Sequence, residues 1–160
     1  MCIRDSSCIL SFRDELPSLI QSQSSDLLKE NSFTFEELLV KNVKNLKFKS
    51  LNEKILIHGH CHQKAFDVVK PIEQILNKVP ELKFETINTS CCGMAGAFGY
   101  DKSTYDISMK MANDKLFPAI KKYKANVKVI ADGTSCRCQI KDGLNIQAIH
   151  LAKFLDNNII

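Results

Sequence analysis

Cysteine is the residue type best able to do chemistry in this chain, which has seven cysteines among 160 residues. Cys61, the adjacent pair Cys91 and Cys92, and Cys136 each follow a short run of β-type residues. Thiolates are soft ligands that favour iron–sulfur clusters, zinc or copper(I), and cysteine is the usual ligand of such clusters. A zinc knuckle usually carries two close Cys-x-x-Cys pairs, which this chain lacks. The pattern therefore favours an iron–sulfur centre.

The adjacent pair adds to this expectation. Neighbouring thiols on an extended backbone point in different directions, which suits ligands on two iron atoms better than one tetrahedral ion. Gly93 and Gly96 follow in the run GMAGAFG. Glycine lets the backbone approach a bulky centre and offer its N–H groups to sulfur. We therefore expect both glycines to contact the bound centre.

His60 and His62 flank Cys61 and are the histidines best placed to contact a centre. An imidazole there could ligate iron, hydrogen-bond a cluster sulfur or handle a proton, and we favour the hydrogen-bonding role. Lys64 and Arg137 could offset the negative charge of a thiolate-rich centre, or face solvent.

Short β-type runs alternate with helical stretches from residue 53 onward. The strand candidates are KILIH (54–58), KFETI (83–87) and VKVIA (127–131). This alternation predicts an α/β fold, with a small parallel sheet of about three to four strands flanked by helices. Ligand sites form at the carboxyl ends of parallel strands, so the cysteines, which follow those ends, should converge at one edge.

Periodic apolar residues predict the helices. One long segment follows Gln63 and another spans 102–123, with interruptions at Pro71 and Pro118. Further helices are expected at 9–20, 34–46 and 147–155, with the polar stretch QSQSSD between the first two.

The composition, 44% hydrophobic and 25% charged with a net charge of +4, is that of an ordinary globular domain. The basic residues are scattered, which argues against a nucleic-acid binder. No apolar run approaches the roughly 20 residues of a membrane-spanning helix, and no export leader is evident. We therefore expect a cytoplasmic protein without a transmembrane segment, any contact with the inner membrane being peripheral.

Three runs of residues carry a resemblance to a known family: HGHCHQKA (58–65), SCCGMAGAFGY (90–100) and DGTSCRCQI (132–140). Together they resemble the cysteine-rich CCG domain in the C-terminal region of FAD-linked 2-hydroxyacid oxidoreductases, such as D-lactate and D-2-hydroxyglutarate dehydrogenases. Related domains occur in heterodisulfide reductase and in the iron–sulfur subunits of glycolate oxidase and anaerobic glycerol-3-phosphate dehydrogenase.

The resemblance implies a ligand set for a cluster, of which the 4Fe-4S type is expected. Cys61, Cys91, Cys92 and Cys136 match the family's cysteines, whereas Gly133 stands where the family has the first cysteine of a closing Cys-x-x-Cys. Ser7-Cys8 followed by Arg13-Asp14 echoes Ser135-Cys136 followed by Lys141-Asp142. Cys8 would then end a preceding half-domain and supply the missing ligand.

The same resemblance divides the chain. Residues 1–6, MCIRDS, look like a translated sequencing adapter and are set aside. Residues 7–50 would be the tail of a preceding CCG half-domain with a helical connector, and residues 51–160 the CCG domain itself.

The implied function is electron transfer from FAD to an unidentified acceptor. The FAD would be bound in the missing upstream part, and the implied partners are upstream FAD and ferredoxin-like domains of the same polypeptide or complex. We expect no catalytic residue here, because nothing resembles a flavin site or a nucleophilic triad. Two alternatives stay open: a structural zinc site in an interaction domain, and a thiol-redox module at Cys91-Cys92 or Cys136-Cys138.

Overall fold

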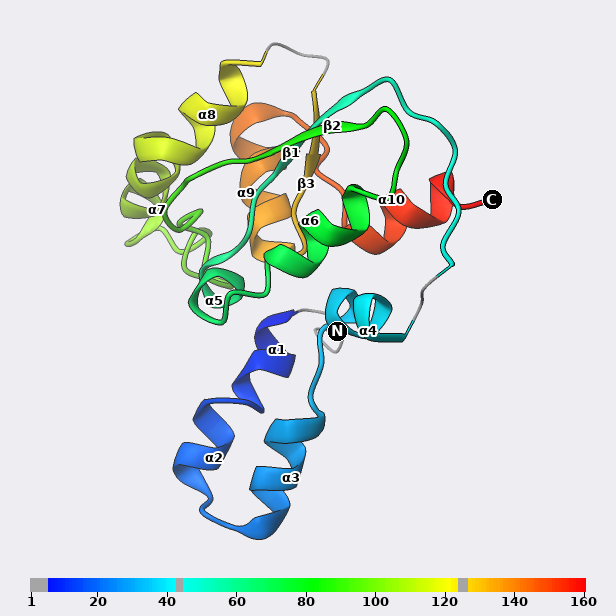
Figure 1. The fold of residues 1–160 in the computed structure, drawn as a ribbon. Coiled ribbons are helices and arrows are strands. Elements are labelled where there is room, and N and C mark those ends of the chain that lie inside the picture. The colour runs from blue at the N-terminus through cyan, green and yellow to red at the C-terminus, as the bar shows by residue number, and fades with distance from the viewer. Residues whose placement is uncertain (1–5, 43–44, 124–126) are drawn as a thin grey trace.

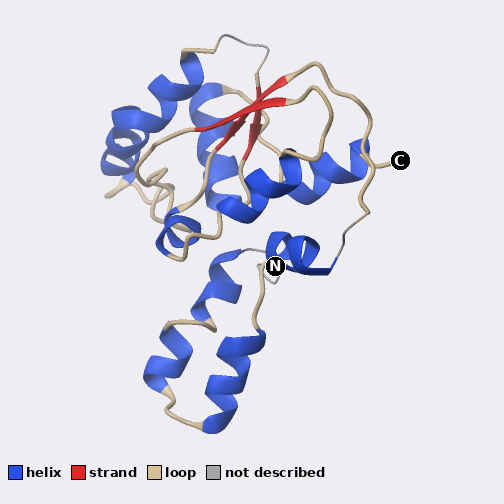
Figure 2. Ribbon diagram, in the orientation of Figure 1, coloured by secondary structure: helices blue, strands red, loops and turns tan. Residues whose placement is uncertain are grey.

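A parallel three-stranded sheet lies at the centre of the fold. The computed structural model describes residues 6–42, 45–123 and 127–160. Its strands are β1 (Lys54–Ile57), β2 (Lys83–Thr86) and β3 (Lys128–Ile130), in the order β2-β1-β3 (Figure 2). Leu56 of β1 pairs with Glu85 on one side and Val129 on the other. The predicted α/β class and parallel sheet are confirmed.

The side chains of β1 alternate between two apolar layers, which is why this central strand is apolar from Ile55 to Ile57. Leu56 packs in a cluster with residues of α7 (Tyr105–Met111), the π-helical turn η2 (Ala112–Leu116), α8 (Phe117–Lys121) and α9 (Thr134–Leu144). Ile55 and Ile57 pack on the opposite face with α6 (Lys70–Leu76) and α10 (Leu151–Asn158) (Figure 1). Burying a Leu or Ile side chain stabilises a fold by about 1.5–3 kcal/mol, so both layers contribute.

Both predicted proline interruptions are confirmed. Pro71 lies in the first turn of α6, which is separated from α5 (Cys61–Ala65) by a turn in which Asp67 has a φ of 56°. Pro118 lies in the first turn of α8, directly after the π-helical turn. Proline lacks an N–H and is tolerated in the first turn of a helix. A new helix therefore begins at Pro71, whereas at Pro118 the helical backbone continues from the π-helical turn into α8.

Two helices were not predicted. α9 begins at Thr134, within a stretch whose glycine and small polar residues suggest a loop, so Cys136 lies in a helix and not in the loop expected after β3. α3 (Gln23–Asn31) begins in the polar stretch QSQSSD, because Ser22 and Ser25 form a capping box. The last helix, α10, begins at Leu151 instead of near residue 147.

The N-terminal helices form an arm that extends from the α/β body (Figure 1). They are α1 (Ser6–Ser11), α2 (Glu15–Leu19) and α3, whereas α4 (Phe35–Asn42) contacts α6 of the body. The helix expected at 9–20 is thus split, and the one expected at 34–46 is shorter. Arg13 links the arm to α4 through a bidentate ion pair with Glu37, at 2.5 and 3.1 Å. Residues 1–5 of the presumed adapter, and 43–44 of the expected helix, lie outside the described residues. None of the helices in the described ranges is long and apolar enough to cross a bilayer.

Candidate metal centre

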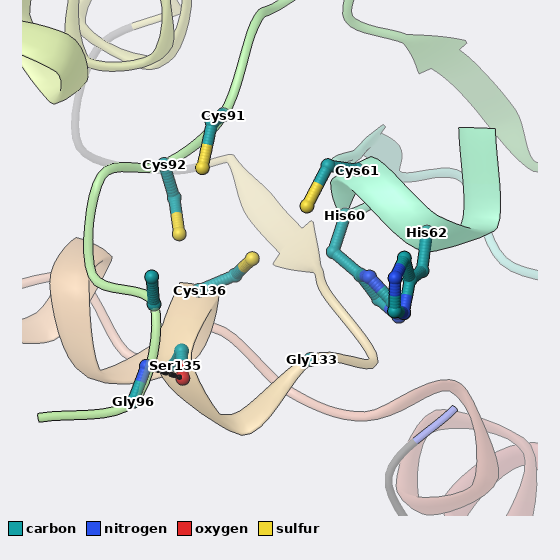
Figure 3. Close-up of a pocket in the computed structure, with 10 residues that line it drawn as sticks. His60, Cys61, His62, Cys91, Cys92, Gly96, Gly133, Ser135 and Cys136 are labelled. Carbon is teal, nitrogen blue, oxygen red and sulfur yellow. Dashed lines mark hydrogen bonds between the residues drawn. The ribbon is translucent and has the colours of Figure 1, made fainter. Parts of the chain in front are cut away.

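A pocket of 280 Å³ opens at the carboxyl edge of the sheet, where the cysteines were expected to converge. Figure 3 shows the sulfur atoms of Cys61, Cys91, Cys92 and Cys136 directed toward a common space. The residues that line the pocket are His60, Cys61, His62, Cys91, Cys92, Ala95, Gly96, Gly133, Ser135 and Cys136. The four thiols that were matched to the family's ligands therefore share one cavity.

Each sulfur reaches the pocket from a segment that follows a different strand. Cys61 is the first residue of α5, after β1, and Cys136 lies in the first turn of α9, after β3. Cys91 and Cys92 come from the loop after β2, so the parallel order of the strands brings the three segments together.

The thiols also interact with one another. A hydrogen bond with Cys92, followed by burial, raises the pKa of the Cys91 thiol well above its ordinary value. A hydrogen bond with Cys136 is the largest cause that raises the pKa of Cys92 to about 12. All six cysteines in the described ranges are free thiols. Both sulfurs of the adjacent pair face the pocket, although an extended backbone would send them apart.

The two glycines after the pair have different roles. The backbone N–H of Gly96 donates to Ser135 Oγ at 3.1 Å, and Gly96 lines the pocket. Gly93 does not line the pocket, but its N–H donates to Cys91 Sγ at 3.4 Å. Gly93 has a φ of 88°, and a β-carbon there would overlap the backbone oxygen of Ser108 in α7. Gly93 thus lets the cysteine loop pack against α7.

His60 and His62 both line the pocket, with ring centroids 6.2 Å apart. The backbone N–H of His60 donates to Gln63 Oε1 at 3.2 Å, and Gln63 Nε2 donates to Asp132 Oδ2 at 3.0 Å. This buried chain of hydrogen bonds connects the start of α5 to the residue before Gly133. It fixes the two loops relative to each other.

His58 lies behind the pocket and is almost fully buried. Its Nδ1 is 2.9 Å from Thr89 Oγ1, while its Nε2 is buried with no hydrogen-bond partner. Burial, assisted by the charge of Lys64, lowers the pKa of His58 to about 3, so this imidazole is neutral at physiological pH.

Gly133 and Cys8 were the open positions of the expected ligand set. Gly133 lines the pocket, so a cysteine at this position would add a thiol to the cavity wall. Cys8 is exposed on α1; it is not among the lining residues, although α1 contacts α5. A ligand role for Cys8 stays a prediction. Cys138 is half-buried in α9 and also lies outside the lining.

The donor set fits a thiophilic metal centre. Four uncrosslinked thiols in mutual contact cannot all ionise without a cation to balance their charge, and a metal centre supplies one. The backbone around them supplies N–H donors, and the site needs no large movement to bring the sulfurs together. The remaining lining residues are small or are imidazoles, which suits an inorganic centre better than a bulky organic cofactor.

Sequence reasoning missed a second cluster of ionisable groups, formed by Glu36, Asp132 and His150. Glu36 is 2% exposed, and burial together with the charge of Asp132 raises its pKa to about 7. Asp132 Oδ1 accepts a hydrogen bond from the Leu151 N–H at 2.9 Å. Glu36 stands in an ordinary amphipathic stretch, FEELLV, and no pattern there marks it as buried.

Comparison with known proteins finds relatives among oxidoreductase components. The chain is 26% identical over 147 residues to one of the subunits of anaerobic glycerol-3-phosphate dehydrogenase from Escherichia coli, a match that covers 91% of this chain and 37% of that subunit. It is 32% identical over 120 residues to an uncharacterized iron–sulfur protein of Methanocaldococcus jannaschii, covering 72% of this chain and 24% of that protein.

A shorter match, 36% identical over 59 residues, links the chain to D-2-hydroxyglutarate dehydrogenase of Pantoea ananatis, covering 37% of this chain and 6% of that enzyme. The chain thus spans little more than a third of the length of the E. coli protein. No protein-family model matches the chain. No solved structure matches it. The relatives nevertheless confirm the resemblance read from the cysteine runs: the chain is a relative of the cysteine-rich CCG domains of FAD-linked oxidoreductases.

Proposed function

We propose that this chain holds an iron–sulfur cluster, of the 4Fe-4S type, on Cys61, Cys91, Cys92 and Cys136. Its role is to pass electrons from a flavin bound elsewhere in a larger 2-hydroxyacid oxidoreductase to an acceptor. The observation that carries the proposal is the convergence of four free thiols, from the three segments that follow the strands, on one pocket.

The names of the relatives support this function. One relative is named as an iron–sulfur protein, one as a subunit of anaerobic glycerol-3-phosphate dehydrogenase, and one as a D-2-hydroxyglutarate dehydrogenase. The match to D-2-hydroxyglutarate dehydrogenase favours a hydroxyacid as the substrate of the whole enzyme. FAD and any further clusters would be bound by partner domains outside this chain.

The residues of the pocket would hold the cluster and shape its surroundings. Bound there, a cluster would supply one-electron transfer. The four thiolates would anchor it, and the Gly93 N–H, already directed at Cys91 Sγ, would stabilise negative charge on that ligand.

Metal analysis of the anaerobically purified protein tests the proposal. We expect iron and acid-labile sulfide in comparable amounts, little zinc, and an electron paramagnetic resonance signal on reduction. Serine substitution of Cys61, Cys91, Cys92 or Cys136 should each remove most of the iron. Cys138→Ser is the matched control, because Cys138 shares α9 with Cys136 but lies outside the pocket lining.

Structural zinc is the second candidate, because four thiols at one point are also the donor set of a closed zinc site. Zinc without iron or sulfide would establish it and refute the cluster. Full thiol reactivity without any metal would favour the thiol-redox alternative instead.

A further inference from the structure

We propose that Lys64 is a positioning residue for the centre, fixing the loop that carries Cys91 and Cys92 and tuning the reduction potential of the cluster by its charge. This inference rests on the proposed function. It assigns a role to a residue that lies behind the sulfurs and does not line the pocket.

The first half of the inference rests on hydrogen bonds. Lys64 lies three residues after Cys61 on α5, so both side chains project from the same side of that short helix. Its Nζ donates to the backbone oxygen of Thr89 at 2.5 Å and to that of Ser90 at 3.5 Å. A third contact, at 3.3 Å, goes to Thr89 Oγ1. Lys64 thus ties the two residues before Cys91 to the helix that presents Cys61.

The second half rests on charge. The hydrogen bond to the Ser90 carbonyl places the Lys64 ammonium group beside the residue that precedes Cys91. Burial lowers the pKa of Lys64, and the charges of the four proposed ligands act in the opposite direction, which agrees with that placement. Lys64 is half-buried, where an ion pair is less screened by solvent than on the surface.

Arg137 makes a useful comparison. Its guanidinium donates to the backbone oxygens of Ala131 and Asp132 and to Thr134 Oγ1, at 2.9, 2.5 and 3.0 Å. Arg137 therefore closes the turn between β3 and α9, as Lys64 closes the loop after β2. The two cations thus hold the segments that follow β2 and β3, from which Cys91, Cys92 and Cys136 reach the pocket.

A positive charge stabilises the more negative, reduced form of a cluster, which raises its reduction potential. Removal of that charge should make the cluster harder to reduce, even if every ligand stays in place. If Lys64 acts only as a clamp, that is, only by holding the loop with its hydrogen bonds, the reduction potential of a fully loaded Lys64→Gln variant should be unchanged.

The test uses three variants in the full chain, each purified anaerobically and titrated with dithionite while the reduced signal is followed by electron paramagnetic resonance. Lys64→Gln keeps a hydrogen-bond donor but loses the charge, and Lys64→Arg keeps both. Lys70→Gln removes an equal charge from an exposed position on α6, paired with Asp67. We expect the midpoint to shift to a more negative potential only in Lys64→Gln.

A second measurement needs no cluster. In the metal-free protein, amide hydrogen exchange in 89–93 should be faster in Lys64→Met than in the wild type, and close to the wild type in Lys64→Arg. This measurement still tests the positioning role of Lys64 if Lys64→Gln does not retain iron.

The outcomes are distinguishable. Equal midpoints in fully loaded wild type and Lys64→Gln, or an equal shift in Lys64→Arg, would overturn the inference while leaving the cluster intact. Unchanged exchange in Lys64→Met would overturn the clamp. Failure of the wild type to bind iron would overturn the proposed function, and this inference with it.

Discussion

A β-carbon at Gly133 would lie 3.3 Å from the Sγ of Cys136. Gly133 has φ of −68° and ψ of 125°, a conformation open to any L-residue, so its lack of a side chain is not required by the backbone. His60 is the other neighbour, with its Cβ and Cδ2 each 3.4 Å from that position. A cysteine at position 133 would therefore place its thiol beside Cys136, at the wall of the pocket.

Gly133→Cys should add a fifth thiol to the cavity and increase the retention of iron severalfold when the protein is exposed to air. The control is Gly133→Ala, which introduces the same β-carbon without sulfur. Iron per chain after a timed exposure, with the reduced spectrum, measures the effect. Equal retention in the two variants would show that residue 133 does not reach the centre.

Alanine substitutions at Gly93 and at Gly96 separate the energetic cost of a positive φ from the cost of overpacking. Both residues have positive φ, of 88° and 67°, so alanine in either position carries a backbone cost of about 1–2 kcal/mol. At Gly93 the new methyl would also overlap the Ser108 oxygen, whereas nothing lies within 4 Å of it at Gly96. Because overpacking costs roughly 1–3 kcal/mol more, Gly93→Ala should lower the free energy of unfolding further than Gly96→Ala. Urea unfolding measures both, and equal losses would contradict the packing role of Gly93.

Gly143 in α9 packs against Phe117 in α8, and this contact gives a further test. A β-carbon there would overlap the ring of Phe117. Alanine is favoured over glycine in a helix by about 1 kcal/mol, but overpacking of a well-filled core costs roughly 1–3 kcal/mol. Gly143→Ala should therefore destabilise the protein, and Phe117→Leu in the same chain should restore part of the loss. Thermal unfolding of the single and double variants checks this; a stabilised single variant would contradict it.

Glu36 gives a pH dependence whose sign follows from its environment. Burial, then the charge of Asp132, raises its pKa from 4.5 to about 7, so the folded state holds this proton more tightly than the unfolded state. Its contribution to stability is therefore fully present below pH 4.5 and is lost as the pH rises through about 7. His58, which burial keeps neutral, contributes with the opposite sign over part of this range, so the effect of Glu36 is read from a difference between two proteins. The free energy of unfolding of the wild type minus that of Glu36→Gln should fall by up to about 3 kcal/mol between pH 4.5 and about pH 7.

Glu37 is the matched control, because its shift has the opposite sign. Burial alone would raise the pKa of Glu37, but the hydrogen bonds and charge of Arg13 hold it below the ordinary value. Its contribution is present above pH 4.5 and is lost as the pH falls. The same difference taken for Glu37→Gln should therefore show no fall between pH 4.5 and pH 7. A difference between wild type and Glu36→Gln that stays constant over this range would contradict the raised pKa of Glu36.

The sequence predicted the parts of this fold that depend on local pattern. The alternation of β-type runs with periodic helices gave the parallel sheet, and the positions of Cys61, Cys92 and Cys136 after the strands gave their convergence. Pro71 and Pro118 act through covalent geometry, so their effects were predictable from position alone. The directions of the thiols were not, because the turn at Gly93 and its packing on α7 set them.

The failures have a different physical origin. α9 forms around Cys136 although its first residues favour turns, because Ile140 is buried against the sheet and Arg137 closes the preceding turn. Tertiary packing of this kind overrides weak local propensity. The burial of Glu36 likewise depends on the docking of α4, which no local pattern records.

Cys92 and Cys136 are each 3% exposed and belong to the same apolar cluster as Leu56 and Val129. One wall of the pocket is thus the interior of the protein, an insulating medium of low polarity. Cys61 is exposed on the other side. For a centre held here, the electron donor and the electron acceptor would both approach from the solvent-exposed side, next to Cys61.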